Sequence, residues 1–275
     1  AVSRLSEAAR HAGLPEPSFY PEPIAATLSF LHEHDTRPGE FFLTFDFGGG
    51  TLDLCVLERT ESGFEIRSTT GIGLGGDALD RAIFQTKLFP ALGEGVFVPD
   101  YPSAPENLRP FRFSDYADLL LNWQNAYQLN TRWLREQIRL GMMAGGEAEE
   151  KLSRLRLLIM KNLSYNCMRA VEQAKIALSR EEETRIQVPP LGLEVPFSRG
   201  ELEAIIGPHL GSIRSVVEEA LELAGVKSSQ LRAVVSTGGS SRIPRVKQLL
   251  HEVTGCEILQ HSTFTGIAAG LAIAN

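Results

Sequence analysis

Cysteine is scarce in this sequence, with only Cys55, Cys167 and Cys256 among 275 residues. They are far apart, odd in number and lie in apolar segments, which argues against a disulfide framework or a cysteine metal cluster and predicts a reducing, cytoplasmic location. Basic charge is also short: 27 Lys+Arg against 34 Asp+Glu give a net charge of −7, so a nucleic-acid partner is not expected. Because no apolar run approaches the roughly 18 residues of a membrane span, a membrane partner is not expected either.

The rest of the composition is that of an ordinary folded protein. Hydrophobic residues make up 43% and charged residues 22% of the chain, which is too apolar for a disordered protein. At roughly 150 residues per domain, the length predicts one large domain or two small ones.

Hydrophobic periodicity predicts an α/β fold in which a mainly helical segment interrupts a sheet. Three strands open it as an antiparallel meander, and the segment 96–110 reads as a proline-rich loop. Ser198 and Glu201 have the spacing of a capping box and begin a helix that ends near Gly225. The expected strands are 41–47, 51–57, 63–69, 184–188 and 231–236, and the expected helices are 77–89, 114–140, 147–178, 198–225, 243–253 and 266–274.

A glycine turn, Asp46-Phe47-Gly48-Gly49-Gly50-Thr51-Leu52-Asp53, lies between two of these strands. Glycines let the backbone approach a ligand and direct N–H groups at an anion, and Thr51 adds a hydroxyl. Asp46 and Asp53 can hold a hydrated divalent cation through their oxygens, as Mg²⁺ prefers. The pattern favours a site for phosphate and metal; the alternative is a glycine hairpin with two solvated aspartates.

A second glycine turn, Thr237-Gly238-Gly239-Ser240-Ser241-Arg242, follows an apolar strand and precedes a helix. This context places unpaired N–H groups and the positive end of a helix at a ligand site, where Arg242 can stack on an aromatic base. The alternative is an exposed arginine in the first turn of a helix. The formal G-x-G-x-x-G at 71–76 is not interpreted as a dinucleotide fingerprint, because a proline-rich segment stands where the second strand and its acid are needed.

Five motifs in order make the chain resemble the nucleotide-binding domain of DnaK-type heat-shock chaperones, in the actin-like ATPase superfamily. The first glycine turn is similar to their D-x-G-G-G-T-x-D, and Leu74–Asp80 (LGGDALD) is similar to their L-G-G-x-x-x-D. Glu172–Ser179 (EQAKIALS) resembles E-x-A-K-x-x-L-S, and Val235–Pro244 resembles the adenosine motif V-G-G-S-x-R-x-P. Glu22–Ala26 (EPIAA) resembles the hinge segment E-P-x-A-A.

The resemblance implies a ribonuclease H-like mixed sheet flanked by helices, with an inserted, mainly helical subdomain. Between Asp80 and Glu172 lie 172 − 80 − 1 = 91 residues, more than mainstream chaperones carry, which indicates the divergent YegD-like branch. The family's first phosphate loop is absent before Glu22, so the chain is expected to contain lobe II and the tail of lobe I. The implied division is 1–38 as the tail of lobe I with the hinge, 39–80 and 184–275 as subdomain IIA, and 81–183 as subdomain IIB.

The resemblance also implies a role for each matching residue. Asp46 would position or deprotonate the attacking water, Glu22 would touch the magnesium shell, and Asp46 and Asp53 would hold the metal through water. Glu172, Lys175 and Ser179 recur at i, i+3 and i+7, so they share one helical face; the alternative is a salt-bridged solvated face. The residues implied to bind ATP or ADP are Gly48, Gly49, Gly50 and Thr51 at the phosphates, Glu172, Lys175 and Ser179 at the adenosine, and Gly238, Gly239, Ser240 and Arg242 at the adenine and ribose.

The implied function is slow Mg·ATP hydrolysis by the full-length protein, coupled to lobe closure. The 275-residue piece is expected to bind nucleotide weakly with almost no turnover. The implied partners are client proteins or co-chaperones and the missing lobe I. Two alternatives remain: a sugar or acetate kinase of the same superfamily, and a non-catalytic module whose helical insertion binds a partner. His261–Gly266 (HSTFTG) departs from the family's N-P-D-E-A, and Trp123 and Trp133 are assigned to packing.

Overall fold

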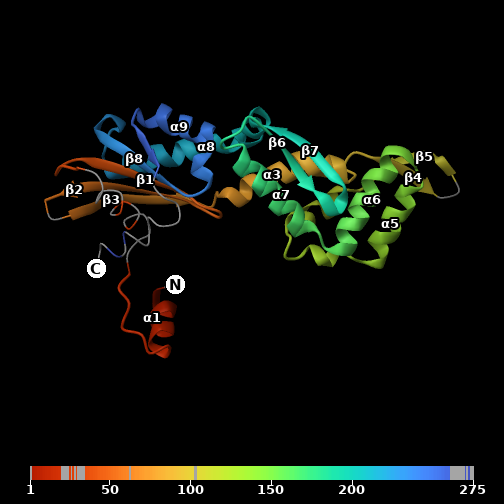
Figure 1. Ribbon diagram of the computed structural model, residues 1–275, viewed down its shortest axis with the longest axis horizontal. Helices are drawn as coiled ribbons and strands as arrows, with labels where there is room; N and C mark the ends of the chain where they lie inside the picture. The colour runs from red at the N-terminus through yellow and green to blue at the C-terminus, as the bar shows by residue number, and fades with distance from the viewer. Residues whose placement is uncertain are drawn as a thin grey trace. The chain divides into compact units, whose positions relative to one another are not determined.

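The computed structural model describes residues 2–19, 25, 27, 29, 35–61, 63–101, 104–260, 270 and 272 (Figure 1). The chain divides into two compact units. The first unit comprises 1–75, 212–242 and 246–275, and the second comprises 76–211 and 243–245.

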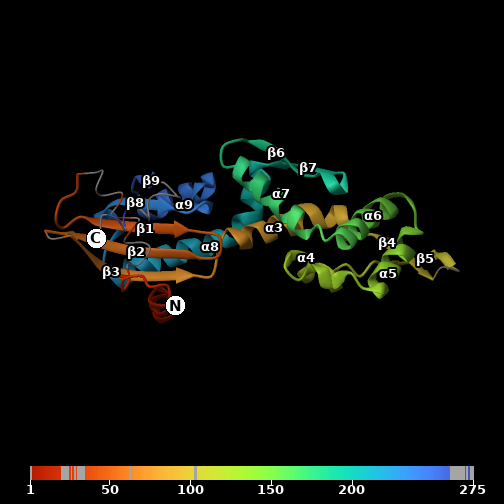
Figure 2. The same cartoon turned by 60° about the horizontal axis from the view of Figure 1, so that its bottom comes forward.

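The first unit is built on a five-stranded mixed sheet in the order β3-β2-β1-β8-β9. β1, β2 and β3 form the predicted antiparallel meander and run side by side (Figure 2), whereas β8 and β9 add to β1 in parallel. The central strand β1 buries nearly all of its side chains, as a strand covered on both faces must. The strands are β1 (Phe41–Phe47), β2 (Leu52–Thr60), β3 (Gly63–Ile72), β8 (Leu231–Thr237) and β9 (Ile258–Gln260).

Both faces of this sheet are covered. On one face, the hydroxyl of Ser68 donates a hydrogen bond of 2.7 Å to the carbonyl of Ala220 in helix α8. The register pairs Ser68 with Val56 and Val56 with Leu43, so the next residue, Thr44, points to the opposite face. There its hydroxyl oxygen lies 2.5 Å from that of Thr27, which is fully buried. Helices α1 (Val2–His11), α8 (Arg199–Ala224) and α9 (Pro244–Thr254) contribute residues to this unit, and the described residues 25, 27, 29, 270 and 272 are also helical.

Helix α8 begins as the sequence predicts. The backbone N–H of Ser198 donates to Glu201 Oε2 at 2.8 Å, and the N–H of Glu201 donates to Ser198 Oγ at 3.3 Å, which is a capping box. The helix ends before Gly225, whose φ is +65°, a conformation that favours glycine after a helix. The predicted strand at 231–236 and helix at 243–253 are confirmed as β8 and α9, and the turn after α9 is again a glycine, Gly255, with φ +66°.

The second unit is mainly helical and carries two short hairpins. Helix α3 buries Leu79, Ile83 and Phe84 along one face, and Thr131 accepts a hydrogen bond of 3.1 Å from the N–H of Leu134 at the start of α5. The elements are α3 (Gly76–Leu88), β4 (Phe97–Tyr101), β5 (Ala104–Pro110), α4 (Ser114–Leu121), α5 (Arg132–Met142), α6 (Gly146–Lys161), α7 (Ser164–Ala177), β6 (Glu183–Val188) and β7 (Leu193–Ser198).

The prediction of a loop at 96–110 is wrong, because β4 and β5 pair there as an antiparallel hairpin. A two-stranded sheet consists only of edge strands, so proline is tolerated where an N–H would face solvent. The partner strand of the predicted 184–188 strand, β7, was missed because Pro196 interrupts its pattern. The two units also differ from the expected subdomains, since the β6–β7 hairpin packs with α7 and belongs to the second unit.

The two long helical patterns each break into two helices. The segment 122–131 between α4 and α5 contains Asn122, Asn125 and Asn130, which compete with the helical backbone for hydrogen bonds. Asn162 ends α6 in the left-handed conformation with φ 51°. Of the last predicted helix, 266–274, only Gly270 and Ala272 lie within the described residues, and both are helical.

All three cysteines are free thiols: Cys55 and Cys167 are buried and Cys256 is half-buried. Burial raises the pKa of the Cys167 thiol to about 12, so this group is protonated and unreactive at neutral pH. In the part of the chain that the structure describes, no helix has the length and apolar character needed to cross a bilayer.

Candidate functional site

The two glycine turns meet because β1 and β8 are parallel neighbours. Asp46 lies beside Thr237 in the register, so both strands end at the same edge of the sheet. The turn 48–51 therefore leaves the sheet next to the turn 238–242. Loops at the carboxyl ends of adjacent parallel strands are the usual position of ligand sites in α/β proteins.

The two turns are in direct contact. The hydroxyl of Ser240 donates to the carbonyl of Gly48 at 3.4 Å. Gly238 has φ +82°, and a Cβ atom at this position would lie 2.3 Å from the carbonyl oxygen of Phe47 and 2.9 Å from Asp46 Oδ1. Only a residue without a side chain allows the two backbones to approach this closely.

A second glycine braces the first turn. A Cβ atom on the buried Gly75 would lie 2.2 Å from the carbonyl oxygen of Gly49 and 2.4 Å from the carbonyl carbon of Gly50. The turn itself is closed by a hydrogen bond of 3.0 Å from the N–H of Gly48 to the carbonyl of Thr51. Gly49, Gly50 and Thr51 are exposed, so the turn is held from behind and open to a ligand.

Asp46 and Asp53 are direct cross-strand partners in the β1–β2 ladder. Directly opposed residues point to the same face, and like charges in this position destabilise a sheet unless a cation lies near them. Thr51 Oγ1 donates to Asp53 Oδ2 at 2.6 Å, so the hydroxyl proton of Thr51 is engaged in this hydrogen bond. Mg²⁺ binds through one or two carboxylates together with water and phosphate oxygens, and this pair fits that donor set.

Among the described residues, no group of three or more His, Cys, Asp or Glu side chains is placed to hold a metal ion, so the pair has no third ligand of these types there. The remaining predicted catalytic residue, Glu22, lies outside the described residues, as does the segment 261–266.

The second turn continues as a single 3₁₀ turn, Ser240–Arg242, and α9 begins only at Pro244. The sequence predicted that the positive end of the helix lies directly at the glycines. This prediction is wrong, because the 3₁₀ turn separates Gly238 and Gly239 from the N-terminus of α9. Ser241 Oγ donates to the carbonyl of Gly238 at 2.7 Å and fixes this turn. Burial, and then the charge of Arg242, lower the pKa of Lys247. Two cations thus lie close together near the turn, and sequence reasoning did not single out Lys247.

The predicted adenosine face on α7 is only partly formed. Glu172 and Lys175 belong to the helix, but α7 ends at Ala177, and Ser179 lies in the turn beyond it, where its hydroxyl donates to the carbonyl of Ile176 at 2.7 Å. Serine at a helix end readily bonds the backbone in this way. Glu172 is paired with Arg169 at 2.8 Å.

Lys175 is held by a buried ion pair between α7 and α3. Its Nζ donates to Asp80 Oδ2 at 2.9 Å and to the carbonyl of Gly76 at 3.2 Å, and the two side chains are 9% and 11% exposed. Burial raises the pKa of Asp80, and the charge of Lys175 offsets part of that rise. Because an ammonium has three N–H donors, the two bonds that Lys175 makes within the described residues leave one donor for a ligand.

We expect Asp80→Ala to lower the free energy of unfolding by about 3–5 kcal/mol, because it leaves the Lys175 ammonium buried without its partner. The double variant Asp80→Leu/Lys175→Met is expected to recover most of this loss, since it buries no charge. Urea unfolding followed by circular dichroism measures both. The exposed Glu136–Arg139 pair is the control, and Glu136→Ala should leave the unfolding midpoint unchanged. Equal losses in the single and double variants would contradict a charge-pairing role.

Comparison with known proteins identifies relatives across most of the chain. The sequence model of the family described as "Hsp70 protein" matches residues 3–89 and 158–273, which include all five motifs. "Chaperone protein DnaK" of Thermus thermophilus is 30% identical over 267 residues, which cover 92% of this chain and 33% of that protein. "Chaperone protein DnaK" of Cenarchaeum symbiosum is 30% identical over 255 residues, covering 90% of this chain and 30% of that protein.

A plant relative, "Heat shock 70 kDa protein 6, chloroplastic" of Arabidopsis thaliana, is 28% identical over 260 residues, covering 91% of this chain and 28% of that protein. The chain spans about a third of the length of the curated relatives it matches. The family match covers well over half of the chain and includes both glycine turns, which the mixed sheet brings into contact. The chain therefore belongs to the Hsp70 family.

Proposed function

We propose that this chain is the lobe II part of the ATP-binding domain of an Hsp70-type chaperone and that its two glycine turns bind ATP or ADP with Mg²⁺. The observation that carries this proposal is the direct contact between the turns at 48–51 and 238–242, beside the opposed carboxylates of Asp46 and Asp53. Exposed glycine backbone at the ends of two parallel strands suits a polyphosphate.

In this proposal each predicted residue has a defined task. The N–H groups of the turn at Gly48, Gly49, Gly50 and Thr51 bind phosphate oxygens, and Asp46 orients the attacking water, with Glu22 nearby in the metal shell. Asp46 and Asp53 would hold Mg²⁺ through water, and the ion supplies charge that neutralises the phosphates. Gly238, Gly239, Ser240 and Arg242, together with Glu172, Lys175 and Ser179, contact the nucleoside.

The proposal extends to the whole protein. We propose slow ATP hydrolysis by the full-length chain, client proteins or co-chaperones as partners, and a cytoplasmic location. The segment 90–157, which the family match leaves out, contains the helical insertion and supports placing the chain in a divergent, YegD-like branch. A kinase of the same superfamily is less well supported, because the L-G-G and E-x-A-K segments both lie within the chaperone family match.

Calorimetry with ADP should detect weak, Mg²⁺-dependent binding by this chain, and a phosphate-release assay should detect almost no turnover. In the full-length protein, Asp46→Asn is expected to lower kcat for ATP hydrolysis by about 10²–10⁴-fold, the usual contribution of a positioned base. Undiminished hydrolysis by Asp46→Asn would contradict the role of Asp46. Partner binding that survives Asp46→Asn would favour the interaction-module alternative.

A further inference from the structure

Helix α6 carries an apolar pair of side chains on its solvent face. The helix packs beside α5 (Figure 1), and its inner face buries Leu152, Leu155, Leu158 and Ile159. On the opposite face, Leu157 and Met160 are 37% and 46% exposed. The solvent face of such a helix is normally polar, so the fold alone does not account for this pair. Residues 146–157 of α6 also lie in the segment 90–157 that the Hsp70 family match leaves out.

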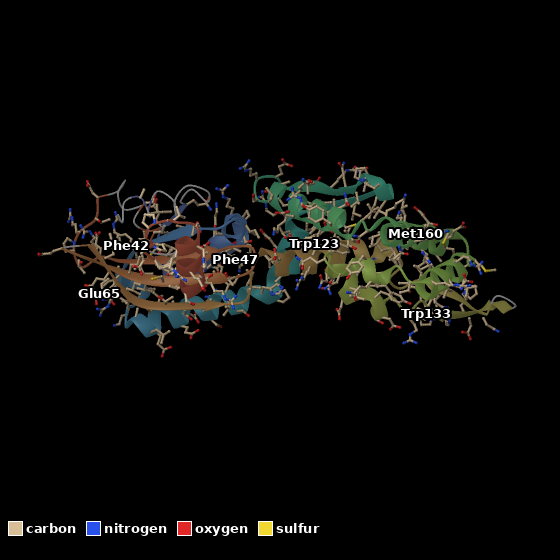
Figure 3. The ribbon with its side chains drawn as sticks, turned by 90° about the horizontal axis from the view of Figure 1, so that it is seen from below. Phe42, Phe47, Glu65, Trp123, Trp133 and Met160 are labelled. Atoms are coloured by element: carbon tan, nitrogen blue, oxygen red, sulfur yellow. The ribbon has the colours of Figure 1, made fainter. Side chains whose placement is uncertain are left out.

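The two tryptophans of the second unit are also partly exposed. Trp123 is 43% and Trp133 is 58% exposed, and their ring centroids lie 5.1 Å from that of Tyr165 and 6.5 Å from that of Tyr116, respectively. The prediction that both are packing residues is therefore only partly confirmed. Figure 3 shows Met160 apart from both tryptophans, so the apolar pair on α6 is a separate feature.

The charges on the solvent face of α6 are separated along the helix. The exposed acids Glu149 and Glu150 lie in its first two turns, and the exposed cations Arg156 and Lys161 lie in its last two. Glu150 pairs with Arg154, whereas Glu149, Arg156 and Lys161 form no hydrogen bond or ion pair within the part of the chain that the structure describes. An acidic start and a basic end suit the helix dipole, but these three charges also remain available to another chain.

The periodicity of the helix orders these side chains across its solvent face. At 100° per residue, Glu149 and Arg156 lie along one edge of this face and Glu150 and Lys161 lie along the other, with the apolar pair between the two edges. Within one chain, the acid and the cation of each edge are separated by about 10 Å or more along the helix axis. They are therefore too far apart to pair with each other.

We propose that the solvent face of α6 is an interface through which two copies of this chain associate, with their α6 helices packed antiparallel. A two-fold axis brings each edge of the face against the same edge of the second copy and reverses its direction. Glu149 of each copy then meets Arg156 of the other, and Glu150 meets Lys161. The midpoints of these two pairs fall close together near the middle of α6, so one axis serves both.

The occupant is a second copy because the face is complementary to itself. It presents acids and cations in equal number at opposite ends, and the antiparallel arrangement encloses the Leu157 and Met160 side chains of both copies between the charged edges. A contact limited to one helix face is small, so the dimer is expected to be weak, and its exposed ion pairs make it weaker at high salt. This interface lies within the second unit and does not depend on nucleotide binding at the glycine turns.

Sedimentation velocity of this chain tests the association directly. The sedimentation coefficient should rise with protein concentration, and about 0.5 M NaCl should reduce this rise. Leu157→Asp is expected to weaken the dimer at least about tenfold, because both copies lose an apolar contact. The matched variant Leu223→Asp, at a leucine of α8 that is 59% exposed, should not weaken it. A monomer at every concentration up to about 0.5 mM, or equal effects of the two variants, would overturn the proposal.

Charge reversal tests the antiparallel arrangement. Glu149→Arg and Arg156→Glu each place like charges opposite one another twice in the dimer, so each variant alone is expected to associate at least about tenfold more weakly. An equimolar mixture of the two variants should associate again, because opposite charges then meet at both contacts between unlike copies. Both side chains are exposed, so both variants are expected to fold, and their thermal unfolding midpoints are the control. Unchanged association of the single variants, or a mixture that associates no better than either variant alone, would overturn the proposal.

Discussion

Replacing Gly75 by alanine is expected to weaken ADP binding about 100-fold and to weaken adenosine binding far less. A Cβ atom at this position meets the backbone of Gly49 and Gly50 at 2.2–2.4 Å, so the turn at 48–51 must move for alanine to fit. A displacement of about 1 Å at a positioned site costs on the order of 100-fold. Calorimetry with ADP and with adenosine separates the phosphate contribution from that of the nucleoside.

Gly73 provides the matched control. It lies two residues from Gly75 in the same glycine cluster, but a Cβ atom there would meet nothing within 4 Å, so Gly73→Ala should bind ADP like the unmodified chain. Circular dichroism confirms that both variants fold. Equal losses for ADP and adenosine in Gly75→Ala would indicate a general disruption and contradict a specific brace on the phosphate turn.

Gly238→Ala is expected to lower the free energy of unfolding by at least about 2 kcal/mol and to abolish measurable ADP binding. Alanine at φ +82° is strained by about 1–3 kcal/mol, and its Cβ would lie 2.3 Å from the carbonyl oxygen of Phe47 and 2.9 Å from Asp46 Oδ1. The two turns must therefore separate. Urea unfolding and ADP calorimetry measure the two effects.

The neighbouring glycine, Gly239, provides the control for the free energy of unfolding. A Cβ atom at Gly239 would meet nothing within 4 Å, and this residue has no positive φ, so Gly239→Ala should change the free energy of unfolding by no more than about 0.5 kcal/mol. If Gly238→Ala and Gly239→Ala were equally stable, the close contact between the turns would not be a structural requirement.

Local pattern was sufficient to predict most of the elements that carry the site. Alternation and flanking glycines predicted the β1–β3 meander, the capping box predicted the start of α8, and the two turns stood out as glycine clusters at the ends of apolar strands. The predictions were wrong where a strand depends on pairing with a second strand. The β4–β5 hairpin and β7 contain proline, which local sequence rules interpret as ending a strand. These segments are nevertheless strands, because β4 pairs with β5 and β7 pairs with β6.

Residues that are close together in the chain were enough to specify the glycine turns, their flanking strands and the family to which the chain belongs. Only the tertiary structure shows that the backbones of Gly75 and Gly238 lie against the backbone of the first glycine turn and its flanking strand. It also shows that Lys175 pairs with Asp80 and that Trp123 is exposed beside Tyr165. These are contacts between residues distant in sequence, and their energies depend on distance and burial, which spacing along the chain does not specify.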